Sequence, residues 1–156
     1  MISNTPFRLS LLLLLSGCSS PPECPQTIDS SPAASAGCLV IENHQLLVAQ
    51  TYAGVVSIPG GSGSDKEASH CTAHRETWEE TGLSVKPTKL VRVFDNGFHL
   101  YRCRWQGPQS ETSPPFVLEI EKAFWITAEQ FDQFRWRFPE QAQWLKQLLE
   151  SDDEPN

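Results

Sequence analysis

The chain has 156 residues, with 39% hydrophobic and 20% charged side chains and a formal net charge of −7. This acidic balance, with a pI near 5.0 and no basic stripe, argues against nucleic acid as a partner. Beyond a Ser- and Pro-rich N-terminal region, about 120 residues remain, which suffice for one domain with a hydrophobic core.

The first 17 residues have the pattern of a signal peptide. Arg8 precedes an apolar run, Leu9–Leu15, that is interrupted only by a serine. The run is shorter than the roughly 20 residues that a membrane-spanning helix needs, and the small residues after it are typical of a cleavage site. We therefore predict that the protein is exported and that residues 1–17 are removed.

The end of this segment, Leu15–Cys18, resembles a bacterial lipobox. The resemblance implies that Cys18 is lipidated, becomes the mature N-terminus and anchors the protein to a membrane. Ser19 stands in place of the aspartate that retains many lipoproteins in the inner membrane, which favours the periplasmic face of the outer membrane. The alternative is cleavage near Gly17 without a lipid.

Residues 18–36 are predicted to form a flexible tether, because Ser, Pro and Ala dominate and no apolar periodicity is visible. The four cysteines after Cys18 can form two disulfides in an oxidising compartment. Three pairings are possible. The sequence does not choose among the candidates Cys24, Cys38, Cys71 and Cys103.

Residues 37–150 are predicted to form one folded domain, followed by an acidic tail at 151–156. Turn signals occur at Asn43-His44 and at Asp95–Gly97, the latter typical of a hairpin. Strands alternating with a central and a C-terminal helix predict an α/β (α+β) domain with a mixed sheet. Strands are expected at 37–41, 45–52, 55–58, 84–94, 98–105 and 117–126, and helices at 67–80, 128–134 and 139–149.

The central predicted helix carries three glutamates on one face and ends before Gly82. Glu76, Glu79 and Glu80 are spaced i, i+3, i+4 and therefore lie on one side. Three like charges there destabilise an isolated helix, so a positive partner is expected. A hard divalent cation such as Mg²⁺ or Mn²⁺ prefers oxygen ligands of this kind.

Arg75 is the expected organiser of these carboxylates. It lies four residues before Glu79, the spacing at which an arginine and a carboxylate meet on a helix. Glu67, at the helix start, can engage the same guanidinium. The alternative interpretation is that the glutamates form an ordinary solvated face of the helix. That interpretation would also have to account for the loop glycines and the arginine.

The segment from Gly61 to Leu83 resembles the Nudix box, G-x5-E-x7-R-E-U-x-E-E-x-G-U, where U is a bulky aliphatic residue. Thr77 is the single departure, at a position where an aliphatic residue is usual, and Ile58-Pro59-Gly60 resembles the usual lead-in. Flanking strands extend the likeness over residues 36–150. The fixed positions are Gly61, Glu67, Arg75, Glu76, Glu79, Glu80 and Gly82.

The resemblance implies an α/β/α sandwich that hydrolyses a diphosphate linkage with Mg²⁺ or Mn²⁺. By position, Glu79, Glu80 and the Gly60 carbonyl would be metal ligands, and Glu76 a ligand or general base. Arg75, with Gly61 and Glu67, would orient the carboxylates or substrate. The general base often lies outside the box in this family. The candidates here are Glu111, Glu119 and Glu121, and Glu119 is preferred among them. For any one of the three, the favoured alternative is an ordinary surface acid.

The expected substrate is a nucleoside diphosphate linked to a further group or a diphosphate of the cell envelope, such as a lipid diphosphate. The predicted export favours envelope diphosphates, because free nucleoside triphosphates are expected to be scarce outside the cytoplasm. One alternative is an exported scavenger of soluble nucleotide derivatives such as ADP-ribose. Another is a non-catalytic Nudix-like binding module. The sequence does not predict an oligomeric state.

Several other side chains invite functional readings. His70 and His74 have the spacing of a zinc pair, but a structural role is favoured because they face away from the glutamates. Trp136 is expected to be a packing anchor. Phe94, His99 and Tyr101 could line the substrate groove or belong to the core, since strand aromatics are usually half-buried.

Overall fold

The structure, a computed structural model, describes residues 21–26, 28–105, 107, 112–115 and 118–151. Short strands dominate, and the two α-helices are far apart in sequence. In chain order the elements are β1 (Ser35–Leu39), β2 (Ile41–Glu42), β3 (Gln45–Thr51), β4 (Val55–Ser57), β5 (Gly60–Ser62), α1 (Ser69–Thr81), β6 (Val85–Val93), β7 (Phe98–Trp105), β8 (Ile120–Ile126), the 3₁₀ helix η1 (Ala128–Gln133), β9 (Arg135–Trp136) and α2 (Pro139–Glu150).

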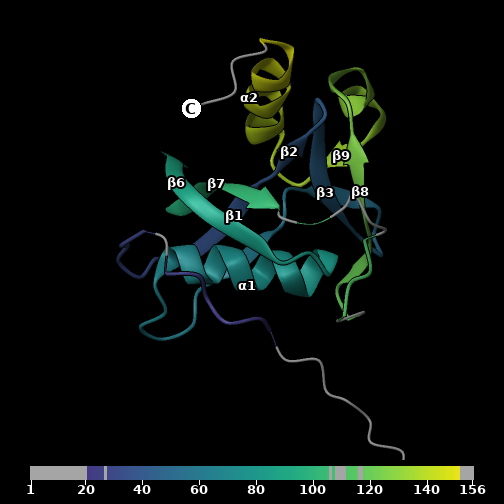
Figure 1. Cartoon of the computed structure of the whole chain (residues 1–156). Coiled ribbons are helices and arrows are strands. Elements are labelled where there is room, and N and C mark those ends of the chain that lie inside the picture. The colour runs from purple at the N-terminus through teal and green to yellow at the C-terminus, as the bar shows by residue number, and fades with distance from the viewer. Residues whose placement is uncertain (1–20, 27, 106, 108–111, 116–117, 152–156) are drawn as a thin grey trace, which may run out of the picture.

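The strands form two mixed sheets. The first has the order β5-β1-β7-β6, with β1 and β7 parallel and the other pairs antiparallel. The second has the order β2-β3-β4-β9, with β8 also paired to β3. Figure 1 shows α1 packed below the strands and α2 above them, so that the strands lie between two helical layers.

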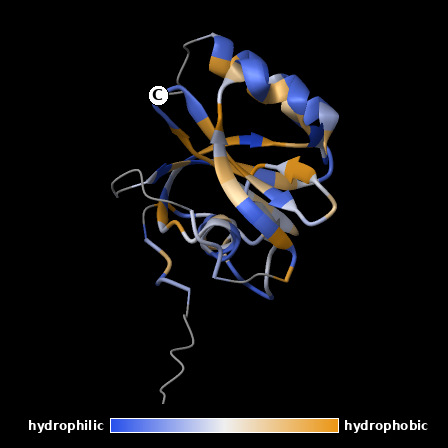
Figure 2. Cartoon of the chain, turned by 90° about the vertical axis from the view of Figure 1, so that its right-hand side faces the viewer, coloured by the Kyte–Doolittle hydropathy of each residue, from blue (hydrophilic) through white to orange (hydrophobic). Residues whose placement is uncertain are grey.

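Apolar side chains fill both interfaces between helix and strand. One core cluster includes Leu46, Val48 and Leu100 and extends to Leu145 of α2. The other includes Leu47 and Tyr101 and extends to Ala73 of α1. Figure 2 shows the hydrophobic colouring concentrated along the strands between the helices. The predicted α/β/α sandwich with mixed sheets is therefore confirmed.

Both ends of α1 follow from local sequence. Gly82 adopts the left-handed conformation, with φ of 77°, and its N–H donates to the Trp78 carbonyl at 2.8 Å, so the predicted helix stop is confirmed. The helix begins at Ser69 rather than at Glu67. A turn closes first, because the Glu67 N–H donates to the Ser64 carbonyl and Lys66 has a φ of 62°.

Most predicted strands are present within one to three residues of their expected bounds. The hairpin at Asp95–Gly97 joins β6 to β7, with Gly97 at a φ of 79°. Two strands were not predicted. Strand β5 is glycine-rich and lacks the side chains that mark a strand. Strand β9 has only two residues, too few for a period-2 pattern.

The N-terminal boundary of the domain lies earlier than predicted. Strand β1 begins at Ser35, and Pro32 forms an isolated bridge with Ala68. The Ser31 carbonyl accepts hydrogen bonds from the Ser69 backbone N–H and side-chain hydroxyl. Part of the segment that composition assigned to a tether is thus attached to the start of α1, because short polar residues there satisfy the helix N-terminus.

Two disulfides select one of the three possible pairings. Cys24 is bonded to Cys71 at the start of α1, with a Cα–Cα distance of 5.3 Å. Cys38 of β1 is bonded to Cys103 of β7, with a Cα–Cα distance of 5.5 Å. Both pairs fit the expectation of two disulfides. Cys18 and residues 1–17 lie outside the described residues, as does the tail at 152–156.

None of the described helices is long and apolar enough to cross a membrane.

Candidate active site

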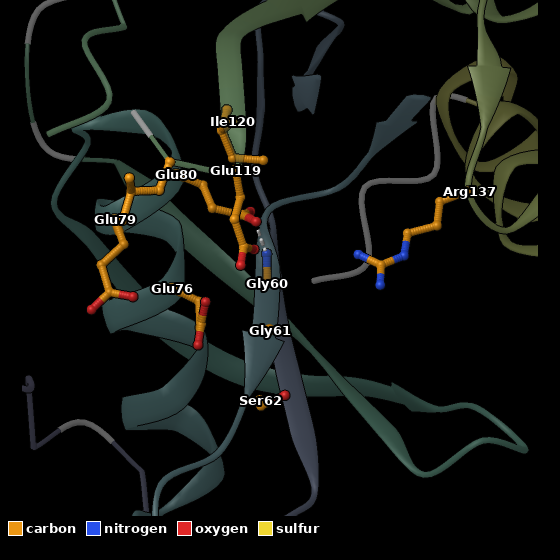
Figure 3. A pocket seen from close by; sticks show the side chains of 10 residues that line it. Gly60, Gly61, Ser62, Glu76, Glu79, Glu80, Glu119, Ile120 and Arg137 are labelled. Carbon is orange, nitrogen blue, oxygen red and sulfur yellow. Dashed lines mark hydrogen bonds between the residues drawn. The ribbon is translucent and has the colours of Figure 1, made fainter. Parts of the chain in front are cut away.

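A pocket of about 500 Å³ opens beside the C-terminal half of α1. Figure 3 shows carboxylates from α1 on one side of this pocket, the glycine strand β5 along its floor and Arg137 on the opposite side. Elements distant in sequence therefore meet here. The lining residues are Gly60, Gly61, Ser62, Glu76, Glu79, Glu80, Leu118, Glu119, Ile120 and Arg137.

Arg75 fixes two of the helix carboxylates. Its Nη1 donates to Glu76 Oε1 at 2.8 Å and to Glu79 Oε2 at 3.0 Å. Its Nη2 donates to the Ser62 carbonyl at 2.9 Å, which ties the guanidinium to strand β5. One arginine thus sets the position of two pocket carboxylates relative to the strand that faces them, and the predicted contact between Arg75 and Glu79 is present.

Glu67 completes this network from outside the pocket. Its carboxylate accepts from Arg75 Nε and Nη2, both at 2.9 Å. It also accepts from the Thr72 hydroxyl at 2.9 Å and the Ser64 N–H at 3.0 Å. These bonds, led by the one to Arg75, lower the pKa of Glu67 to about 2. Glu67 therefore stays ionised and holds Arg75, as the sequence predicts.

Glu80 has a different environment from Glu79. The Gly60 N–H donates to Glu80 Oε2 at 2.9 Å, and burial of the carboxyl raises the pKa of Glu80 to about 8. Burial also raises the pKa of Glu76 above its usual range, against the opposing effect of Arg75. Negative charge on these groups is therefore costly unless a cation neutralises it.

Gly61 is required by the close approach of Glu76. A Cβ on Gly61 would overlap both carboxylate oxygens of Glu76. Any larger residue would push that carboxylate away from Arg75 or out of the pocket. Glycine is therefore needed at position 61 for lack of space, whereas it is needed at position 82 for its left-handed backbone conformation.

The carboxylate set suits a hard divalent cation. Arg75 and Gly60 each hydrogen-bond one oxygen of their partner carboxylates. The second oxygens of Glu76, Glu79 and Glu80 have no hydrogen-bond partner among the described residues and are available as ligands. Oxygen donors of this kind, with two carboxyls of raised pKa, match the preferences of Mg²⁺ and Mn²⁺.

Of the three candidate general bases, Glu119 lies in the pocket. It sits immediately before β8, and Figure 3 shows its side chain beside that of Glu80. Glu121 is exposed and does not line the pocket. Glu111 lies outside the described residues. The preference for Glu119 therefore agrees with its position, and its role as a base stays a prediction.

Three aromatic residues that might have lined the groove do not do so. Tyr101 is buried in the core, with 1% of its surface exposed. Phe94 packs against Trp144 of α2, with ring centroids 6.1 Å apart. His99 lies on β7 and is also absent from the pocket lining. None of these three residues lines the pocket, which forms at β5, α1 and the start of β8.

The histidines of α1 are buried away from the carboxylates. His70 and His74 have 3% and 2% of their surface exposed. His74 Nδ1 lies 2.6 Å from the Val85 carbonyl, which can only accept, so Nδ1 carries a proton. His70 Nδ1 lies 2.8 Å from the Ser30 hydroxyl. Neither histidine lines the pocket, which agrees with the expectation that both face away from the glutamates.

Arg137 was not predicted as a site residue. Its backbone N–H donates to the Val56 carbonyl at 2.9 Å, and β9 just before it pairs with β4. Trp136 anchors this segment, because it stacks on Phe131 with ring centroids 4.8 Å apart. Figure 3 shows the guanidinium of Arg137 directed toward the carboxylates. In the sequence, the Arg-Trp-Arg pattern before Pro139 could have drawn attention to Arg137. That pattern alone does not indicate which of the two arginines faces the pocket.

The fold and the pocket together define a class: a sandwich domain in which a glycine strand and the acidic face of a helix line one pocket. The NUDIX domain family model matches residues 31–150. The chain therefore belongs to the Nudix family, and it is a Nudix-type diphosphate hydrolase.

Individual relatives agree with this assignment. A "MutT-like protein" of Streptomyces ambofaciens is 30% identical over 118 residues, covering 70% of this chain and 74% of the relative. An ADP-ribose pyrophosphatase of Streptococcus suis has a similar fold, with a TM-score of 0.66 and 20% identity over 80% of this chain and 95% of its own. A NUDIX hydrolase of Nitrosomonas europaea gives a TM-score of 0.65 and 18% identity over 83% and 76%.

Proposed function

We propose that this protein hydrolyses a diphosphate linkage with Mg²⁺ or Mn²⁺ held by Glu76, Glu79 and Glu80. The observation that carries the proposal is the set of three carboxylates fixed by Arg75 and Gly60 around one pocket. When bound, the cation would offset the charge of the substrate phosphates and lower the pKa of a water molecule. The Gly60 carbonyl is proposed as a further ligand.

The chain's own groups divide the remaining work. Arg75 keeps Glu76 and Glu79 in position, and Glu67 keeps Arg75 charged and oriented. Glu119 is proposed to take the proton of the attacking water on a carboxylate oxygen, because it borders the same pocket and is exposed to solvent. The leaving phosphate then departs toward the open side of the pocket.

Arg137 is proposed to bind the phosphate that lies farther from the helix carboxylates. Among the described lining residues it is the one cation, and its guanidinium has no ion pair within the described part of the chain. A guanidinium facing carboxylates across a pocket matches a substrate that carries two linked anionic groups. A diphosphate has this property.

We further propose that the enzyme is exported and anchored through a lipid on Cys18, and that its substrate is an envelope diphosphate such as a lipid diphosphate. The signal-like segment and the lipobox-like residues support this location. The two disulfides also support it, because such bonds persist in oxidising compartments. Leu118, 86% exposed at the pocket, offers an apolar surface to a hydrocarbon group.

A substrate panel tests the proposal. The full chain is incubated with Mg²⁺ or Mn²⁺ and with ADP-ribose, a nucleotide sugar, a dinucleoside polyphosphate and a polyprenyl diphosphate, and products are followed by ³¹P NMR. We expect turnover that EDTA abolishes and that is fastest with the polyprenyl compound. Faster turnover of ADP-ribose would instead favour a scavenger of soluble nucleotides. No turnover of any compound would favour a non-catalytic binding module.

Cell fractionation tests the anchor separately. Stable anchoring depends on acyl chains, so Cys18→Ala is expected to move the protein from the membrane pellet to the soluble fraction. The control is Cys24→Ala, which leaves Cys18 intact. A Cys18→Ala variant that stays in the membrane pellet would contradict the lipid anchor.

A further inference from the structure

The disulfide between Cys24 and Cys71 lies in a different environment from the other disulfide. Cys38 and Cys103 are 0% and 1% exposed within the core between β1 and β7. Cys24 and Cys71 are both half-buried, at the surface where the N-terminal segment meets α1. An external thiol can therefore approach one disulfide without opening the fold, and cannot approach the other in this way.

A buried histidine sits directly against the accessible disulfide. His70 Nε2 lies 3.4 Å from Cys71 Sγ. The nearest nitrogen or sulfur atoms of Cys24, His70 and Cys71 all lie within 4.8 Å of one another. The imidazole is 3% exposed, so protein atoms rather than solvent determine its orientation.

Hydroxyl groups surround the Nδ1 side of His70. Ser30 Oγ already accepts the His70 backbone N–H at 3.2 Å, and it lies 2.8 Å from His70 Nδ1. Ser69 donates to the Ser31 carbonyl at 2.9 Å and lies 2.7 Å from the Tyr101 hydroxyl. Ser69 Oγ also lies 3.2 Å from Ser30 Oγ, and we take the arrangement in which Ser30 donates to Nδ1 and the ring proton is on Nε2. A disulfide sulfur has no proton, so Nε2–H is also the tautomer that makes the contact with Cys71 a hydrogen bond.

We propose that Cys24–Cys71 is a thiol–disulfide exchange site whose leaving sulfur is Cys71. A thiolate of an external dithiol attacks Cys24 Sγ, and the bond to Cys71 breaks. Cys71 leaves as a thiolate that accepts the hydrogen bond from His70 Nε2–H, and it also lies in the first turn of α1, where backbone N–H groups favour negative charge. A thiol that leaves as a stabilised thiolate accelerates exchange.

The exchange is completed by the second thiol of the same dithiol. It attacks the mixed disulfide on Cys24, so the dithiol becomes a disulfide and Cys24 is released. Two electrons and two protons pass to the protein, which then carries two thiols in place of one disulfide. The N-terminal segment is afterwards held to α1 only by non-covalent contacts such as those of Ser30 and Ser31.

The test measures both disulfides in one reaction. The full chain is treated with dithiothreitol, samples are quenched by alkylation over time, and peptide mapping by mass spectrometry gives the reduction rate of each pair. We expect Cys24–Cys71 to be reduced at least about tenfold faster than Cys38–Cys103. Equal rates, or faster reduction of Cys38–Cys103, would overturn the proposal.

Variants at His70 separate a chemical role from a structural one. His70→Leu removes the donor and is expected to slow reduction of Cys24–Cys71 by about tenfold, whereas His70→Gln retains an N–H and should slow it less. A variant that merely loosened the fold would speed reduction of both disulfides, which is the opposite change. A His70→Leu protein that is reduced at Cys24–Cys71 as fast as the wild type, or faster, would overturn the role of His70.

Discussion

The two halves of α1 contact very different surroundings. In the first half, Ser69, His70 and Cys71 are tied to the N-terminal segment by hydrogen bonds and a disulfide. In the second half, Glu76, Glu79 and Glu80 face a pocket and have oxygens without partners among the described residues. The polar groups of the first half are thus paired within the protein, whereas those of the second half are only partly paired, by Arg75 and Gly60, and would be completed by the proposed cation.

This difference explains how one helix of 13 residues can carry a costly charge cluster. Like charges at i, i+3 and i+4 destabilise a helix, and burial adds to that cost at Glu80. Arg75 offsets part of this cost through its ion pairs with Glu76 and Glu79, and the covalent and hydrogen-bonded attachment of the first half stabilises the helix away from the pocket.

The second half of α1 is expected to control turnover. Glu79→Gln and Glu80→Gln each remove one negative charge from the pocket, and each should lower kcat by about 100- to 1000-fold because charge stabilisation at the reacting phosphate is lost. The measurement is steady-state hydrolysis with Mg²⁺, alongside circular dichroism to confirm the fold. Glu121→Gln, an exposed change outside the pocket, is the control. Near wild-type rates in either pocket variant would contradict the site.

The two disulfides should differ in their contribution to stability. Cys38→Ala with Cys103→Ala is expected to cost about 4 kcal/mol of unfolding free energy, since loop closure over 65 residues is lost within a buried core. The 47-residue loop closed by Cys24–Cys71 gives a similar chain-entropy contribution, but this pair is only half-buried at the surface, so Cys24→Ala with Cys71→Ala should cost less, about 2–3 kcal/mol. Urea unfolding of both double variants measures the difference. A reversed order would show that the first half of α1 depends more on its disulfide than the core does.

Arg137 and Arg135 provide a matched pair on opposite sides of Trp136. Arg137→Gln should raise KM by roughly 10- to 150-fold with a smaller change in kcat, because a charge-assisted contact to phosphate is worth about 1.5–3 kcal/mol. Arg135 contacts the Ala53 carbonyl and does not line the pocket, so Arg135→Gln should leave KM unchanged. Equal KM values for the two variants would remove Arg137 from the proposed phosphate site.

Glu80 should give the metal-free protein a modest pH dependence. Its folded pKa of about 8 lies above the ordinary value of 4.5, so the folded state favours the protonated acid. Stability from this group is therefore present below about pH 4.5 and is lost as pH rises through 8. Glu80→Gln mimics the neutral acid, so in EDTA the wild type should lose stability relative to this variant between pH 5 and 8. Urea unfolding at the two pH values measures it, and parallel curves would contradict the burial effect.

The sequence predicts the second half of α1 better than the first. Periodicity and the glycine stop locate the carboxylate face, because those signals act within one helix turn. The attachment of the first half could not be predicted, since Ser30 and Cys24 reach α1 from about 40 or more residues away. Composition instead indicated a tether there. Arg137 was missed for the same reason: its place depends on the pairing of β9 with β4.

Binding of Mn²⁺ tests the central assignment most directly, because it does not depend on knowing the substrate. Free Mn²⁺ is measured by electron paramagnetic resonance during titration of the full chain, its Glu79→Gln and Glu80→Gln variants and the control Glu121→Gln. We predict saturable binding by the wild type and the control, and binding weakened by at least about tenfold in both pocket variants. Equal Mn²⁺ affinity in all four proteins would contradict a cation site on the second half of α1.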